Sequence, residues 1–141
     1  MMFMPQRPYL PLGSLRAALT YPAGVHKFSA ATVRAALERC GLSHLVDRLN
    51  ETERWDRVLS VGEQQRLAFG RVLLHKPDWV FMDEATSALD EAAEAALYRL
   101  LRDAEWQPTI VSVGHHGTLK RFHEAVIDLG RHPASAAAAG D

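Results

Sequence analysis

Two adjacent carboxylates, Asp83 and Glu84, are the residues of this sequence whose types and position most clearly indicate chemistry. They directly follow residues 79–82 (WVFM), a short apolar run suited to a buried parallel strand. Open α/β sheets bind their ligands at the carboxyl ends of such strands. A carboxylate there can bind Mg²⁺, directly or through water, and its neighbour can orient or deprotonate an attacking water. Because acidic strand ends also serve simply as helix caps, the pair alone leaves both interpretations open.

A helix must start shortly before this strand. Ser60 and Glu63 have the spacing of a capping box, so we expect a helix from near Val61, and Pro77 cannot continue it. The small residues Ser60 and Gly62 at the start of this helix are typical of helix N-termini that bind anions. An anion site beside metal-binding carboxylates suggests a nucleoside triphosphate as the ligand.

Three motifs in this stretch resemble those of ATP-binding cassette (ABC) proteins, in the order and spacing of that family. Residues 59–65 (LSVGEQQ) resemble the signature motif, residues 80–84 (VFMDE) the Walker B strand, and residues 87–90 (SALD) the D-loop. Residues 5–22 (PQRPYLPLGSLRAALTYP) are similar to the Q-loop segment of exporter-type ABC ATPases, especially peroxisomal fatty-acyl half-transporters and their bacterial relatives. The resemblance covers about residues 1–129.

The resemblance implies an α/β fold, a partial P-loop NTPase (RecA-like) parallel sheet with an inserted α-helical subdomain, and ATP and Mg²⁺ as cofactors. The catalytic roles that it implies are Glu84 as general base, His115 on the γ-phosphate, and Gln6 on the metal and the attacking water, with Asp83 and Gln6 as metal ligands. In the family, two ATPase domains dimerise head to tail, and the signature motif contacts the partner's ATP. In this chain, the residues that would make that contact are Ser60, Gly62 and Glu63, and Asp90 would couple the two sites.

Of the histidines, His115 is the one whose position in the sequence indicates a functional role. It follows residues 109–113, a β-branched run that predicts another buried strand, and it resembles the family's switch histidine. An imidazole can donate to a phosphate and can change its charge near neutral pH. A lone histidine more often satisfies a loop carbonyl, but the Walker B strand upstream favours the functional interpretation.

The predicted elements divide the chain into two parts and a tail. Core elements in residues 1–11 and 76–129 flank a helical subdomain at about 12–75, and residues 130–141 form a disordered, Ala-rich tail. We expect strands at residues 1–4, 79–82, 109–113 and 125–129, and helices at 15–19, 29–40, 43–49, 61–76, 91–104 and 118–123. The alternation of strands and helices predicts a parallel sheet.

The composition sets bounds on the class of protein. The 141 residues are 48% hydrophobic, with 16 basic and 17 acidic side chains, so one globular domain without a general affinity for nucleic acid is expected. No apolar run approaches the ~18 residues of a membrane span. We expect a cytoplasmic chain, at the cytoplasmic face of the membrane if it serves a transmembrane transporter domain. One cysteine fits a reducing compartment.

The phosphate-binding loop, G-x-x-x-x-G-K-[ST], does not occur in these 141 residues, since none of Lys27, Lys76 and Lys120 follows a glycine. We therefore expect a fragment of the family's ATPase domain with negligible ATP turnover by itself. Two alternatives remain: a non-catalytic subunit that lends its signature face to an intact ABC ATPase, and a soluble ABC ATPase acting on DNA. The near-neutral charge and the exporter-like Q-loop argue against the second.

Overall fold

A three-stranded parallel sheet forms the centre of the computed structural model, which describes residues 1–114 and 117–129. Its strands are β1 (Met2–Met4), β4 (Trp79–Asp83) and β5 (Thr109–Val113), in the order β1-β4-β5. Met4 pairs with Met82, which pairs in turn with Ser112, so the carboxyl ends of all three strands lie at one edge. The predicted α/β fold with a parallel sheet is confirmed.

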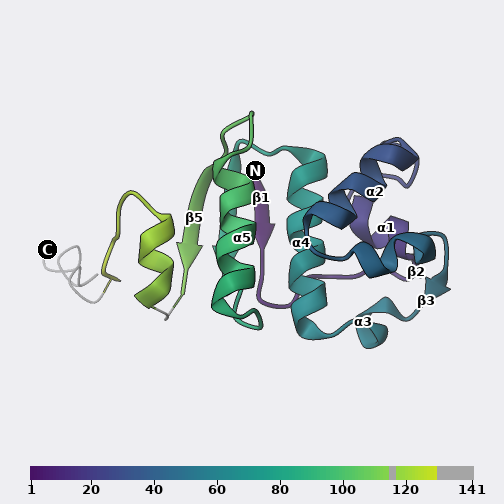
Figure 1. The fold of residues 1–141 in the computed structure, drawn as a ribbon, viewed down its shortest axis with the longest axis horizontal. Coiled ribbons are helices and arrows are strands. Elements are labelled where there is room, and N and C mark those ends of the chain that lie inside the picture. Colours follow the sequence, from purple (N-terminus) through teal and green to yellow (C-terminus); the bar gives the residue numbers. More distant parts are fainter. Residues whose placement is uncertain (115–116, 130–141) are drawn as a thin grey trace, which may run out of the picture.

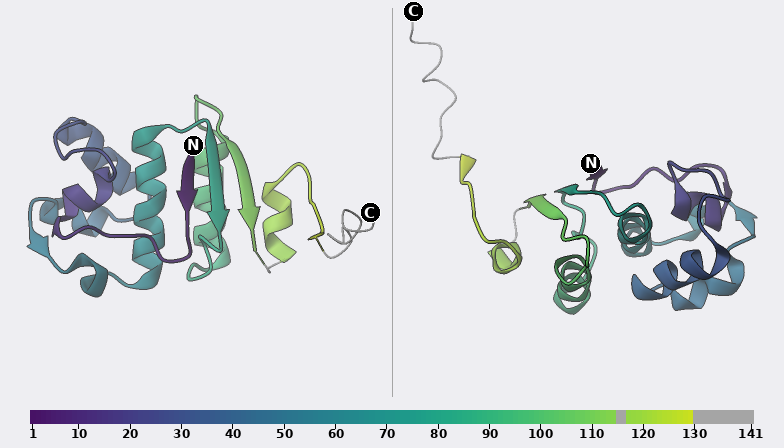
Figure 2. Two further views of the ribbon diagram at one scale, coloured as in Figure 1. Left: turned by 180° about the vertical axis from the view of Figure 1, so that it is seen from behind. Right: turned by 90° about the horizontal axis from the view of Figure 1, so that it is seen from above.

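Two helices cover one face of this sheet, as the view from above in Figure 2 shows. They are α4 (Val61–His75) and α5 (Glu91–Arg102). Alternate strand residues, including Met4, Val80 and Met82, are buried under them. The opposite face carries exposed apolar side chains and is not covered by any helix of the described part of the chain; it includes Phe3, Trp79, Val111 and Val113.

Four further helices lie on the side of α4 away from α5, as Figure 1 shows. They are the 3₁₀ helix η1 (Ser43–Arg48), α3 (Trp55–Val58), and the two that pack directly against α4, which are α1 (Leu15–Thr20) and α2 (Ala30–Arg39). In the same region, β2 (Gly13–Ser14) and β3 (Thr52–Glu53) form a short antiparallel pair. Ser14 and Ser29 accept the predicted N-cap hydrogen bonds of α1 and α2. Among the described residues, no helix is both long and apolar enough to cross a membrane.

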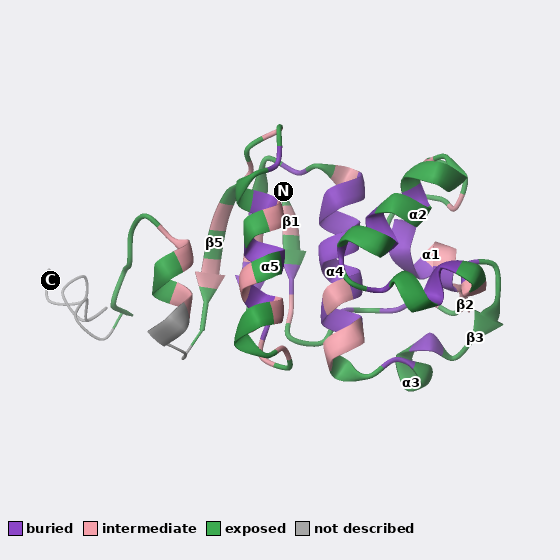
Figure 3. Ribbon diagram, viewed as in Figure 1, coloured by how far each residue is buried: buried purple, intermediate pink, exposed green. Residues whose placement is uncertain are grey.

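The core runs through α4, most of whose residues after the first turn are buried, as the colours of Figure 3 show. Gly70 of this helix faces Leu19 of α1. A Cβ at this position would lie 2.7 Å from Leu19 Cδ1 and 3.3 Å from Cys40 Sγ. A glycine in a helix costs roughly 1 kcal/mol relative to alanine. The absence of a side chain here allows the two helices to pack closely, which explains why the cost is tolerated.

Three predicted elements differ from the structure. The helices expected at 43–49 and 118–123 are 3₁₀ helices, η1 and η2 (Gly117–Phe122). The strand expected at 125–129 is wrong: these residues pair with no described strand, and Val126, Ile127 and Leu129 are exposed. A strand needs a neighbour for its backbone and a face for its side chains, and this segment leads away from the sheet instead (Figure 1). The predicted tail at 130–141 lies outside the described residues.

Candidate functional site

The two carboxylates and Gln6 lie together because of the register of the sheet. Met4 of β1 lies beside Met82 of β4, so Gln6 follows the end of β1 close to the point where Asp83 ends β4 and Glu84 follows it. Asp83 is exposed and Glu84 is half-buried. The structure therefore brings the predicted metal ligand, general base and Q-loop glutamine to one edge of the sheet.

The backbone at Glu84 adopts a conformation that is unusual for a residue with a side chain. Its φ is +55°, in the left-handed region. Its N–H donates to the carbonyl of Val113 over 3.0 Å, and its carbonyl accepts from the N–H of Ser87 over 3.2 Å. Strained residues of this kind concentrate at functional sites, where the surrounding structure holds them. Glu84 thus turns sharply away from β4 while remaining tied to β5.

Gln6 is linked to the turn that follows Glu84. Its exposed carboxamide donates through Nε2 to Ser87 Oγ over 3.2 Å. This is a contact between residues 81 positions apart in the sequence. The loop after β1 and the turn after β4 therefore meet through a side-chain hydrogen bond.

The predicted capping box is present at the start of α4. Ser60 Oγ accepts from the N–H of Glu63 over 3.1 Å, and Glu63 Oε1 accepts from the N–H of Ser60 over 2.9 Å. The other carboxylate oxygen, Oε2, lies 2.8 Å from His44 Nε2. Burial alone would raise the pKa of Glu63, but the N–H of Ser60 and the His44 side chain together hold that pKa below its ordinary value.

Gly62 lies against the backbone of residues 84–90, the acidic turn that follows β4. A Cβ at this position would lie 3.3 Å from the carbonyl oxygen of Ala88. Further along, Asp90 accepts through Oδ1 from the N–H of Ala93 over 2.7 Å and caps α5, as predicted. The start of α4 and the turn 84–90 are thus packed together, with little room for any side chain between them.

Gln65 is a residue of the site that the sequence analysis did not single out. Its Nε2 donates to the carbonyl of Gln6 over 2.9 Å and to Ser87 Oγ over 3.1 Å, and its Oε1 accepts from the N–H of Ala88 over 2.9 Å. A sequence signal was available, because position 65 shares the buried face of α4 with positions 68, 69 and 72. A polar side chain on a buried face requires hydrogen-bond partners.

The predicted site residues form two groups in the structure. Gln6, Asp83 and Glu84 gather at the edge of the sheet, while Ser60, Gly62 and Glu63 form the first turn of α4. The turn 84–90 connects the groups and ends at Asp90. His115 lies outside the described residues, so its role stays a prediction.

The chemistry of the first group fits Mg²⁺. Carboxylate and amide oxygens are hard ligands, and Mg²⁺ is usually held by one or two protein carboxylates together with water and substrate phosphates. Asp83 is exposed at the strand end and offers such a carboxylate. Within residues 1–114 and 117–129, no group of three or more His, Cys, Asp or Glu side chains could hold a metal entirely by itself.

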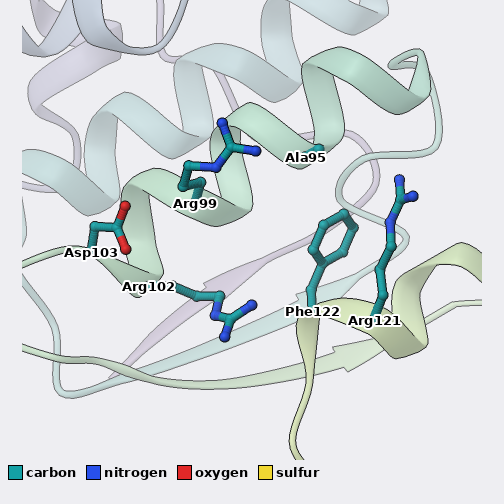
Figure 4. A pocket seen from close by; sticks show the side chains of 6 residues that line it. All are labelled: Ala95, Arg99, Arg102, Asp103, Arg121 and Phe122. Carbon is teal, nitrogen blue, oxygen red and sulfur yellow. The ribbon is translucent and has the colours of Figure 1, made fainter.

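Two other features lie outside this site. A hollow between α5 and η2, shown in Figure 4, is lined by Ala95, Arg99, Arg102, Asp103, Arg121 and Phe122, none of which is a predicted site residue. Cys40 is fully buried, and burial raises the pKa of its thiol to about 12. A thiol held protonated in this way is not a nucleophile.

Comparison with known proteins supports the motif assignments. The family model described as ABC transporter matches residues 13–87, more than half of the 141 residues. This match includes the predicted signature and Walker B motifs.

Several curated relatives align with most of the chain. An "Uncharacterized ABC transporter ATP-binding protein" of Haemophilus influenzae is 46% identical over 91% of the chain and 22% of its own length. "ABC transporter D family member 2, chloroplastic" of Arabidopsis thaliana is 39% identical over 91% of the chain and 22% of its own length. The human "Lysosomal cobalamin transporter ABCD4" is 38% identical over the same two shares, 91% and 22%. The chain thus spans about a fifth of the length of these relatives.

Proposed function

This chain belongs to the ABC transporter family, and from this premise we propose that it is the later part of an ATP-binding and hydrolysing domain of an exporter-type transporter. The observation that carries the proposal is the shared sheet edge of Gln6, Asp83 and Glu84, packed beside the capped start of α4. Nucleotide binding, generally dependent on Mg²⁺, is what membership of this family implies.

Each of the three residues at the sheet edge would have a separate role in hydrolysis. Asp83 would hold Mg²⁺, which when bound would neutralise charge on the transferring phosphate. Glu84 would accept a proton from the attacking water, and Gln6 would orient that water and contact the metal. The strained turn at Glu84 and the Gln6–Ser87 hydrogen bond hold these side chains in place before the substrate arrives.

The first turn of α4 would face the ATP of a second ATPase domain. Ser60 is exposed, and a hydroxyl that accepts in a cap still carries an O–H that can donate to a phosphate oxygen. The helix N-terminus adds backbone N–H groups and a partial positive charge. Gly62 and Glu63 complete this surface, Asp90 lies where the two sites would communicate, and His115 would contact the γ-phosphate.

The phosphate-binding loop must come from outside these 141 residues, because the motif is not among them. We therefore propose that the chain alone turns over ATP negligibly. In its assembly it would work head to tail with a second ABC ATPase domain, at the cytoplasmic face of a membrane and bound to a transmembrane transporter domain. In the non-catalytic alternative, the chain is a subunit that only contributes its signature motif to an intact ABC ATPase, and it would do so through the same surface at Ser60.

ATP hydrolysis by the purified 141-residue chain tests this division directly. We expect no Mg²⁺-dependent phosphate release by the chain alone. Mixing it with a complete ATP-binding domain of the family should produce hydrolysis of the ATP held by that domain, and Ser60→Arg should lower this rate by at least about a hundredfold, because the start of α4 contacts that ATP. Ser29→Arg, which removes the cap of α2 instead, is the control and should leave the rate unchanged. Robust hydrolysis by the chain alone, abolished by Glu84→Gln, would refute the proposal.

A further inference from the structure

We propose that Gln65 is a positioning residue that joins the start of α4 to both the Gln6 loop and the acidic turn. Its carboxamide contacts three residues in these two segments at once. The Nε2 group donates to Gln6 O and Ser87 Oγ, and Oε1 accepts from the N–H of Ala88. The inference rests on the proposed function for its catalytic consequence, but the geometry stands independently of it.

The burial of Gln65 makes these hydrogen bonds obligatory. The residue is 1% exposed, so water cannot replace a lost partner. A glutamine carboxamide has two N–H donors and one carbonyl acceptor, and all of these are used here. Rotation of the amide would place N–H against N–H at Ala88 and oxygen against oxygen at Gln6. A single orientation of Gln65 is therefore compatible with the surrounding backbone.

Ser87 makes this junction relevant to the predicted site residues. Its hydroxyl oxygen accepts from Gln65 Nε2 over 3.1 Å and from Gln6 Nε2 over 3.2 Å. The side chain of Gln6 and the turn beyond Glu84 are thus positioned through the same two residues. Because Gln65 lies little more than one turn after Ser60 on the same helix, a displacement of the α4 start by a bound phosphate would be passed to Gln6 through this junction.

The neighbouring residue provides a matched control. Gln64 is also buried on α4, but its Nε2 donates to the carbonyls of Asp56 and Leu59, over 3.0 and 3.1 Å. These acceptors belong to the segment that precedes the helix. Gln64→Leu and Gln65→Leu therefore remove the same carboxamide from adjacent buried positions, and only the second affects the acidic turn.

Amide hydrogen exchange of the 141-residue chain distinguishes the two variants. Gln65→Leu should speed the exchange of the Ala88 amide about tenfold, while protection in β4 and the centre of α5 is retained. Gln64→Leu should leave the Ala88 amide unchanged. Equal rates at Ala88 in the wild type and Gln65→Leu, or the same acceleration in both variants, would overturn the inference.

A milder substitution keeps the test decisive if Gln65→Leu does not fold. Ser87→Ala removes the shared acceptor at a half-buried position. In a ¹H–¹⁵N spectrum, the side-chain amide signals of both Gln6 and Gln65 should shift, whereas those of Gln64 should stay in place. If the signals of Gln6 and Gln65 are both unchanged, the junction does not exist in solution.

The catalytic consequence has its own measurement. In the mixture with a complete ATP-binding domain, Gln65→Leu should lower kcat at least about tenfold and change KM for ATP by less than about twofold. Gln64→Leu should change neither. An unchanged kcat despite faster exchange at Ala88 would overturn the positioning role. A wild-type mixture without turnover would contradict the proposed function instead, because the exchange at Ala88 still decides whether Gln65 holds the turn.

Discussion

Glu63 Oε2 lies 2.8 Å from His44 Nε2, so the carboxylate that closes the capping box of α4 also ties this helix to η1. His44 is exposed, and the side chain of Glu63 keeps 29% of its accessible surface. The same carboxylate accepts from the N–H of Ser60 through its other oxygen. The predicted signature motif is thus linked to η1 through the Glu63 carboxylate, which is a titratable group.

The first prediction concerns acid stability. Because hydrogen bonds hold the pKa of Glu63 below its ordinary value of 4.5, the folded state binds this proton less readily than the unfolded state. The stabilisation is therefore present above pH 4.5 and is lost as the pH falls through the lowered pKa. Urea unfolding of the wild type and Glu63→Gln should show a difference at pH 7 that shrinks below pH 4.5. A difference that stays constant from pH 7 to pH 3 would contradict the assignment.

The second prediction concerns Gly70. Although alanine is the better helix former by roughly 1 kcal/mol, Gly70→Ala should destabilise the chain by about 1 kcal/mol, because overpacking in a core costs about 1–3 kcal/mol. The clash is with Leu19, which is fully buried and has little room to move. Gly24→Ala is the control, since a Cβ there meets nothing within 4 Å, and it should be neutral or slightly stabilising. A gain in stability for Gly70→Ala would show that α1 and α4 pack less closely.

The third prediction concerns Arg71, a buried arginine of α4. Its Nε donates to the carbonyl of Ala18 over 2.8 Å and its Nη2 to that of Tyr9 over 2.6 Å. Burial lowers its pKa to about 10, so it remains cationic at neutral pH. Arg71→Met should cost about 2–4 kcal/mol in urea unfolding, because the buried carbonyl of Ala18 and the partly buried carbonyl of Tyr9 lose their donor.

The control for Arg71 is an arginine on the surface. Arg57 is exposed, and Arg57→Met should change the free energy of unfolding by less than about 0.5 kcal/mol. Equal effects of the two substitutions would mean that Arg71 contributes no more than a surface charge.

Local signals in the sequence were sufficient for the elements that surround the site. The capping box at Ser60 and Glu63, the break at Pro77 and the apolar run before Asp83 each depend on neighbouring residues, and all three are found in the structure. The parallel pairing of the strands also followed from the alternation of strands and helices, although their order did not. Resemblance to the family's Q-loop, not local spacing, assigned Gln6 to the same site as Asp83 and Glu84.

The features that the sequence did not predict depend on contacts between distant segments. Gln65 reads as one more polar residue near a helix start until its partners at Gln6 and Ala88 are known. The strand expected at 125–129 has suitable residues, but whether they reach the free edge of β5 depends on the path of the chain after η2, which composition does not determine. The close packing at Gly70 could not be predicted either, because the approach of Leu19 is a tertiary contact.

In the proposed assembly, the start of α4 contacts a nucleotide held by a second domain, so binding of the two proteins should depend on ATP. The labelled 141-residue chain is titrated with a complete ATP-binding domain of the family, with and without Mg²⁺ and a nonhydrolysable ATP analogue. The nucleotide should strengthen binding at least about tenfold, and Ser60→Arg should abolish it. Ser29→Arg, which removes the cap of α2 instead, should leave binding intact. Equal binding with and without the nucleotide, or binding that survives Ser60→Arg, would show that the start of α4 does not contact the nucleotide.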